Sequence, residues 1–212
     1  MFESRKDAGR KLGKALEKYK NKNCIVLAIP KGGIEVGIEA AKYINADFSL
    51  IIVRKLPFPD EPEAGFGAIA EDGTMYINPN IYNYLEQETI ESVIDGQRKE
   101  IERRISILRK GSPLPPLENR TAILVDDGIA AGSTMRAAVM MLRGKRAGKI
   151  IIASPVAGAE TVAKLTPLVD EVIVLETPDF FRAVAQAYNN WHDVSDEEAF
   201  ELLKTRNDDR GS

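Results

Sequence analysis

The sequence predicts an α/β fold, an open and mostly parallel twisted sheet that is flanked by helices. Short, continuously apolar segments alternate along the chain with segments whose apolar residues recur at helical spacing. Strands that are apolar throughout are typical of parallel sheets, because helices cover both faces of such a sheet. The chain has 212 residues, which suits one domain with a sizeable core. We therefore expect a single domain over residues 1–212, with its core at about 21–175.

The two kinds of segment occur in a regular order. Apolar runs bounded by Gly, Pro or charged residues predict strands, which we expect at 24–29, 48–53, 121–125, 149–153 and 172–175, with a short pair at 66–70 and 75–77. Apolar residues three or four positions apart predict helices, which we expect at 4–20, 34–44, 90–110, 135–143 and 159–165. The sequence GSPLPP ends the long third helix, because proline cannot continue a helix.

The tail after residue 176 is expected to be rich in helix. Ser195 and Glu198 have the spacing of a capping box, which marks a helix start. The aromatic residues of the tail either bury it against the body or line a pocket for a flat, aromatic substrate; for any single residue we favour burial. These residues are Phe180, Phe181, Tyr188 and Trp191.

Composition excludes several classes of function. Apolar residues make up 44% and charged residues 29%, and the net charge of −3 does not suggest a nucleic-acid or membrane partner. No apolar run approaches the roughly 18 residues of a membrane span, and the N-terminus lacks the apolar core of a signal peptide. One cysteine and one histidine exclude a disulfide framework and a Cys/His zinc cluster. We expect a cytoplasmic enzyme or binding protein.

One long connection, at 56–73, is rich in Pro, Gly, Asp and Glu. Connections of this length are often lids or binding elements. We expect its acidic residues to be mostly solvated; these are Asp60, Glu61, Glu63 and Glu71.

The segment 121–135, TAILVDDGIAAGSTM, combines a strand, two acids, a loop of small residues and a helix start. The N–H groups of a helix N-terminus have no partner within the helix and lie at the positive end of its dipole, so they bind phosphate readily. Asp126 and Asp127 can accept hydrogen bonds from the hydroxyls of a sugar, or face a bound Mg²⁺ directly or through water. The segment therefore predicts a site for a phosphorylated sugar.

Two further segments are expected at the same edge of the sheet. PKGG, at 30–33, follows the first strand, and Arg54 and Lys55 follow the second. Taken alone, PKGG is equally compatible with an ordinary turn, and the basic pair with a solvated strand end. In open sheets of this kind the ligand binds at the carboxyl ends of the strands. Their convergence with the acid pair therefore favours a second anionic group on the ligand.

Residues 125–135, VDDGIAAGSTM, resemble the phosphoribosyl-pyrophosphate motif of the type I phosphoribosyltransferases. The resemblance covers nearly the whole chain. It extends to a group of bacterial and archaeal phosphoribosyltransferase-domain proteins that have no settled substrate. The segments that carry it are SRKDAGRKL, LAIPKGGIEVG, VRKLPFPDEPEAGFGAIAEDG, QRKEIERR, ETPDFFRAV and VSDEEAF.

The resemblance implies a role for each matching position. The paired acids Asp126 and Asp127 would hold the ribose hydroxyls, with Mg²⁺ as cofactor, and Arg54 and Lys55 would face pyrophosphate. The loop at 56–73 would close over the site, and a hood over the base would consist of residues 1–20 and 176–206. The implied positions that bind phosphate or phosphoribosyl pyrophosphate are Lys31, Gly32, Gly33, Gly128, Ala130, Ala131, Gly132, Ser133 and Thr134.

The implied activity is Mg²⁺-dependent transfer of ribose 5-phosphate from phosphoribosyl pyrophosphate to a nitrogenous base. The 6-oxopurine enzymes of the family commonly have an acid where this chain has Ala130, as the adenine enzymes do, so the motif favours a purine acceptor of the adenine type. Glu61 or Glu63 could take over the role of that acid. Dimers are frequent in the family, so a homodimer is compatible with the resemblance.

Two other functions stay open on the sequence. One is a non-catalytic sensor of a nucleotide or of phosphoribosyl pyrophosphate; the other is a hydrolase or phosphatase that acts on phosphorylated sugars.

Overall fold

The main sheet has five parallel strands in the order β2-β1-β6-β7-β8. The computed structural model describes residues 1–62, 64–82 and 85–210. The strands are β1 (Cys24–Ala28), β2 (Asp47–Leu50), β6 (Thr121–Val125), β7 (Lys149–Val156) and β8 (Glu171–Glu176). Ala28 pairs with Val125 and Val125 with Ala153, so the carboxyl ends of the three central strands lie at one edge.

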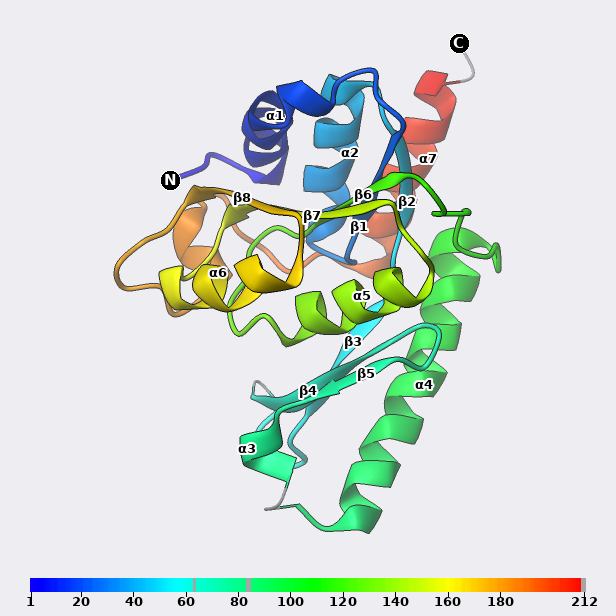
Figure 1. Ribbon diagram of the computed structural model, residues 1–212, viewed down its shortest axis with the longest axis vertical. Coiled ribbons are helices and arrows are strands. Elements are labelled where there is room, and N and C mark those ends of the chain that lie inside the picture. The colour runs from blue at the N-terminus through cyan, green and yellow to red at the C-terminus, as the bar shows by residue number, and fades with distance from the viewer. Residues whose placement is uncertain (63, 83–84, 211–212) are drawn as a thin grey trace.

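Helices cover both faces of this sheet, as expected (Figure 1). On one face lie α1 (Arg5–Ala15) and α2 (Gly33–Ile44); on the other lie α5 (Ser133–Gly144) and α6 (Ala159–Leu165). Strand β6 shows why the sequence run is apolar throughout. Ile123 and Val125 pack in the core beside α1 and α2, whereas Ala122 and Leu124 pack in the core beside α5. Short 3-10 helices occur at η1 (Glu17–Tyr19) and η2 (Thr166–Leu168).

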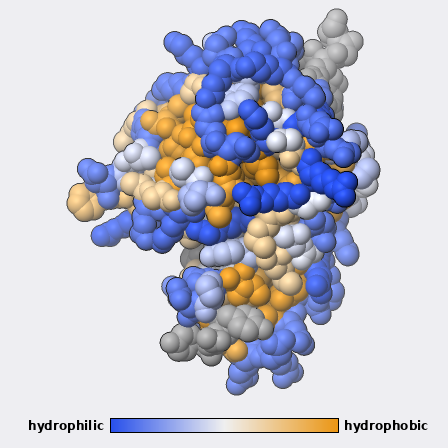
Figure 2. All heavy atoms as spheres, viewed as in Figure 1, coloured by the Kyte–Doolittle hydropathy of each residue, from blue (hydrophilic) through white to orange (hydrophobic). Residues whose placement is uncertain are grey.

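A second, antiparallel sheet lies beside the main body, toward the bottom of Figure 1. Its strands are β3 (Val53–Pro57), β4 (Gly65–Ala70) and β5 (Met75–Ile77), in the order β3-β4-β5. The short α3 (Pro79–Tyr82) follows, and the long α4 (Gln87–Arg109) packs on the sheet through its apolar stripe. Figure 2 shows the whole molecule from the same side: hydrophilic residues lie around the rim of the visible face, and apolar residues lie nearer its middle and on the lower part that contains the second sheet.

The second sheet confirms one prediction and corrects two. The short strands at 66–70 and 75–77 do pair with each other. The strand expected at 48–53 is wrong, because β2 already ends at Leu50. The next two residues, Ile51 and Ile52, are fully buried and lead from one sheet to the other. The apolar run thus spans two elements, and Arg54 and Lys55 lie inside β3 rather than at the end of a main-sheet strand. The connection at 56–73 contains the end of β3 and all of β4, and its other described residues lie outside strands.

The tail contains less helix than expected near its start. It has the 3-10 helix η3 (Val184–Ala187) and then α7 (Asp196–Arg210), which packs against α2 and α4. The N–H of Glu198 donates to Ser195 Oγ at 3.1 Å, as a helix cap requires, but the Glu198 carboxylate binds His192 and does not complete the capping box.

The N-terminal segment and the tail pack together. Phe2 and Tyr188 form a parallel bridge and are both buried. Phe181 and Trp191 pack partly buried against this cluster, whereas Phe180 is 88% exposed. None of the helices in the described part of the chain combines the length and apolar character that crossing a bilayer requires.

Candidate functional site

The PKGG loop and the acid pair lie in direct contact. Each follows one of two paired strands, β1 and β6, and the N–H of Ile29 donates to the Val125 carbonyl at 2.9 Å. A Cβ added to Gly32 would lie 1.9 Å from Asp127 Oδ2, and one added to Gly33 would lie 2.9 Å from the Val125 carbonyl oxygen. Glycine is therefore required at both positions, because the loop backbone approaches residues 125–127 too closely for a side chain. The peptide bond between Pro30 and Lys31 is cis.

The two carboxyl groups differ in their surroundings. Asp127 is only 8% exposed, and its Oδ2 accepts a hydrogen bond from Arg5 Nε at 2.8 Å. Asp126 is partly exposed, and its Oδ1 accepts the N–H of Asp127 at 2.9 Å. Burial, and then the charge of Asp127, raise the pKa of Asp126 well above its ordinary value. Burial also raises the pKa of Asp127, although the Arg5 guanidinium opposes this shift.

Arg5 is a site residue that the sequence reasoning missed. Its Nη1 donates to the His192 carbonyl at 2.9 Å, and its guanidinium lies 4.1 Å from the centre of the Trp191 ring. Arg5 lies within the helix expected at 4–20, where it precedes Ala8 by three positions and Leu12 by seven. A cation on the apolar stripe of a helix is the signal that could have revealed it.

The loop after the acids leads into α5, as the motif predicts. Gly132 precedes the helix with φ of 78°, and Ser133 and Thr134 open its first turn. The loop is held by the N–H of Ile129, which donates to the Val156 carbonyl at 2.9 Å, and by Thr161 Oγ1, which donates to the Ala130 carbonyl at 2.7 Å. Ala130 and Ala131 are exposed, so the small-residue loop is open to a ligand.

The same loop also contacts the tail. A Cβ added to Gly128 would lie 2.4 Å from Val184 Cγ1. The tail therefore packs on the motif itself, at the position where only glycine leaves room.

Helix α4 brings further cations to the PKGG loop. Arg104 is 8% exposed, and its Nη1 donates to the Pro30 carbonyl at 3.4 Å. Lys31 pairs with Asp196 of α7 at 3.5 Å, and Arg103 pairs with the same carboxylate at 2.7 Å. Neither arginine of α4 was predicted as a site residue. Their sequence segment, QRKEIERR, alternates the two charges as a solvated face does.

Only one residue of the predicted basic pair faces this cluster. Arg54 Nε donates to Gln97 Oε1 of α4 at 3.0 Å, and burial followed by the charge of Arg104 lowers the pKa of Arg54. Neighbouring strand residues point to opposite faces, so Lys55 lies on the other face of β3, where its side chain passes beside Gly65. Arg54 thus lies near Arg104, whose guanidinium contacts the PKGG loop, whereas Lys55 lies on the opposite face of β3.

The acidic residues of 56–73 differ in their exposure to solvent. Glu61 is exposed in the connection between β3 and β4, as expected, and Glu63 lies outside the described residues. The expectation for Glu71 is wrong. Glu71 forms a 2.9 Å ion pair with Arg109, both side chains are 7% exposed, and its other oxygen accepts the N–H of Ile52 at 3.1 Å. The long helix α4 supplies the partner that burial of this carboxylate requires.

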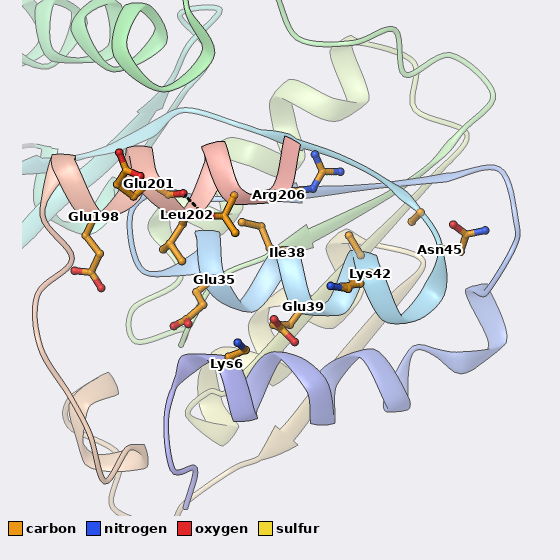
Figure 3. A pocket seen from close by; sticks show the side chains of 13 residues that line it. Lys6, Glu35, Ile38, Glu39, Lys42, Asn45, Glu198, Glu201, Leu202 and Arg206 are labelled. Atoms are coloured by element: carbon orange, nitrogen blue, oxygen red, sulfur yellow. Dashed lines mark hydrogen bonds between the residues drawn. The ribbon is translucent and has the colours of Figure 1, made fainter. Parts of the chain in front are cut away.

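A separate hollow of about 480 Å³ lies between α2 and α7, beside α1 (Figure 3). Carboxylates and cations both line it, with Ile38 and Leu202 among them. None of the predicted site residues lines this hollow.

Comparison with known proteins identifies the family. Residues 3–189 match the model of the phosphoribosyl transferase domain, so the chain belongs to this family.

The chain is similar to two relatives in particular. A Mycobacterium tuberculosis protein, named provisionally as a phosphoribosyl transferase, is 38% identical over 205 residues, which are 96% of this chain and 46% of that protein. The chain thus spans about half the length of the curated relatives it matches. The crystal structure of TT1426 from Thermus thermophilus is 32% identical with a TM-score of 0.79, and the match covers 95% of this chain and 97% of that one.

Proposed function

We propose that this chain is a Mg²⁺-dependent phosphoribosyltransferase that transfers ribose 5-phosphate from phosphoribosyl pyrophosphate to a nitrogenous base. The observation that carries the proposal is the direct contact of PKGG with Asp126 and Asp127, beside the N-terminus of α5. These parts lie at the carboxyl edge of the sheet, where open α/β sheets bind ligands. The family match supports the same chemistry.

The donor has two anionic ends, and the site has two matching regions. The N–H groups and hydroxyls at the start of α5 suit the 5-phosphate, because a helix N-terminus attracts anions. The PKGG loop, with Lys31 and the neighbouring Arg54 and Arg104, suits the pyrophosphate. The acid pair lies between these regions in the chain and would accept hydrogen bonds from the ribose hydroxyls.

Loss of pyrophosphate from C1 leaves a ribose ring with oxocarbenium character. When ionised, the carboxyl group of Asp126 would stabilise this positive charge, and the cations beside PKGG would stabilise the negative charge on the departing pyrophosphate. The nitrogen of the base supplies the electron pair of the new bond, and its proton then leaves for solvent or a carboxylate. This chemistry requires no protein nucleophile.

Mg²⁺ fits the donor set of the site. The described part of the chain contains no group of three or more Asp, Glu, His or Cys side chains that could hold a metal ion. Mg²⁺ is, however, commonly bound by one or two carboxylates together with substrate phosphates, which matches an adjacent acid pair beside a pyrophosphate site. When bound, Mg²⁺ would supply additional charge stabilisation to the pyrophosphate.

The acceptor we favour is a purine of the adenine type. Ala130, exposed at the mouth of the motif loop, stands where the 6-oxopurine pattern has an acid, so the motif offers no carboxylate at this position. Glu61 or Glu63 stays our candidate for handling the proton of the base, and a homodimer stays a prediction.

A product assay tests this function. The chain is incubated with phosphoribosyl pyrophosphate, Mg²⁺ and pooled purines and pyrimidines, and mass spectrometry detects any base that gains ribose 5-phosphate. Asp126→Asn should reduce product formation about 100-fold, on the scale of other lost electrostatic contacts to a transition state. Asp95→Asn, an exposed acid on α4, is the matched control and should leave it unchanged.

Two outcomes would contradict the proposal. Binding of phosphoribosyl pyrophosphate without product from any base would favour a sensor. Release of phosphate without any base would indicate a hydrolase.

A further inference from the structure

The predicted hood reaches the acid pair through one buried ion pair. Arg5 Nε lies 2.8 Å from Asp127 Oδ2, and the two side chains are 5% and 11% exposed. Arg5 belongs to the first turn of α1, whereas Asp127 follows β6 at the centre of the main sheet. The contact therefore joins the chain terminus to the strand edge where the ligand would bind.

The tail fixes the Arg5 guanidinium in one orientation. Its second nitrogen donates to the His192 carbonyl at 2.9 Å, and its face stacks on Trp191 at 4.1 Å. A planar guanidinium held by a hydrogen bond, an ion pair and an aromatic ring has little freedom to turn.

Asp127 is restrained in turn from several sides. Its carbonyl accepts a 2.6 Å hydrogen bond from the hydroxyl of Tyr188, and its carboxylate lies against the backbone of Gly32. Moving this carboxylate away would leave a buried guanidinium without its counter-charge, which is costly in a low-dielectric interior. The position of Asp127 thus depends on Arg5.

We propose that Arg5 is a positioning residue for phosphoribosyl transfer, a role that rests on the function proposed above. Arg5 holds the Asp127 carboxylate against the PKGG loop, and Asp127 holds the neighbouring Asp126 through the hydrogen bond from its N–H. The hood, through Arg5, sets the geometry of the ribose site. Arg5 thus orients Asp127 directly and Asp126 through it, so that both acids keep the positions from which they would accept the ribose hydroxyls.

A double-mutant cycle tests this role. The kcat and KM for phosphoribosyl pyrophosphate are measured for Arg5→Met, Asp127→Asn and the double variant, with Arg5→Lys as the conservative change. Since a displacement of about 1 Å can cost about 100-fold in rate, Arg5→Met should lower kcat/KM by about 10- to 100-fold. Arg5→Lys keeps the charge and should restore part of the loss. If Arg5 acts through Asp127, the double variant should be no more than about threefold worse than the worse single variant.

Controls separate positioning from folding. Arg10→Met removes an exposed cation on the same helix, paired at the surface with Glu39, and should keep full activity. Thermal unfolding by circular dichroism is recorded for every variant; if Arg5→Met does not fold, Arg5→Lys with and without Asp127→Asn provides the cycle.

The outcomes distinguish this proposal from the proposed function. If the wild type is active and Arg5→Met is fully active, or if the two losses multiply in the double variant, the role of Arg5 is overturned while the proposed function stands. A wild type that neither binds nor uses phosphoribosyl pyrophosphate overturns both proposals.

Discussion

Replacing Gly32 by alanine should disable the site while the fold persists. A Cβ at this position would lie 1.9 Å from Oδ2 and 2.4 Å from Cγ of Asp127, well inside the 3.0 Å below which real Cβ contacts are essentially never found. The carboxylate cannot simply rotate away, because Arg5 holds it at 2.8 Å. The PKGG loop and the acid pair must therefore separate by about 1 Å, a shift that can cost about 100-fold in rate.

The effect on stability should be smaller. Overpacking of this kind costs about 1–3 kcal/mol, which in a chain of this size lowers Tm by about 3–10 °C. We expect Gly32→Ala to lower kcat/KM for phosphoribosyl pyrophosphate by about 100-fold and still to unfold cooperatively in circular dichroism.

Gly96→Ala is the matched control. Gly96 is exposed in the middle of α4, and an added Cβ would meet nothing within 4 Å. Alanine favours a helix interior over glycine by about 0.5–1 kcal/mol, so this variant should keep full activity and an equal or higher Tm. Wild-type activity in Gly32→Ala would refute the close approach of the loop to Asp127, and an equal loss in Gly96→Ala would show that the effect is not local.

Three further changes test the packing around the site. Glu71→Ala should lower the free energy of unfolding in urea by about 3–5 kcal/mol, because Arg109 would remain buried without its partner; a loss under about 1 kcal/mol would argue against a buried pair. Hydrogen bonds from two arginines of α4 hold the pKa of Glu100 at about 2 rather than 4.5. The stability that this carboxylate contributes is therefore complete above about pH 4.5 and is lost as the pH falls toward 2, so wild type and Glu100→Gln should converge in Tm between pH 7 and pH 3. Tyr188→Phe leaves the Asp127 carbonyl without its donor and should cost about 1–3 kcal/mol in urea unfolding, with no change expected if that hydrogen bond is absent.

The main sheet could be predicted because its pattern is local. Ala122 and Leu124 face one layer of helices, and Ile123 and Val125 face the other. One continuous apolar run therefore indicates a strand that is buried on both faces. The acid pair and PKGG could be placed together because the ends of parallel strands share an edge. These inferences need only the period of the pattern and the order of the elements.

The errors arose where a residue's partner is distant in sequence. The run at 48–53 is divided between two sheets, since Ile51 and Ile52 are buried by packing rather than by strand pairing. Glu71 is buried because Arg109 reaches it from 38 positions away. Arg5 is buried because it pairs with Asp127, which lies 122 positions away in the sequence. From sequence alone, a charged residue is expected to be exposed to solvent, and only the fold reveals the distant partner that allows it to be buried.

Isothermal titration of phosphoribosyl pyrophosphate in the presence of Mg²⁺ tests most directly whether the acid pair, PKGG and the start of α5 form one donor site. We predict one binding site per chain in the wild type, unchanged affinity in Asp95→Asn, and affinity at least about 10-fold weaker in Asp126→Asn and Gly32→Ala. The absence of binding to the wild type, or wild-type affinity in both Asp126→Asn and Gly32→Ala, would contradict the site described here.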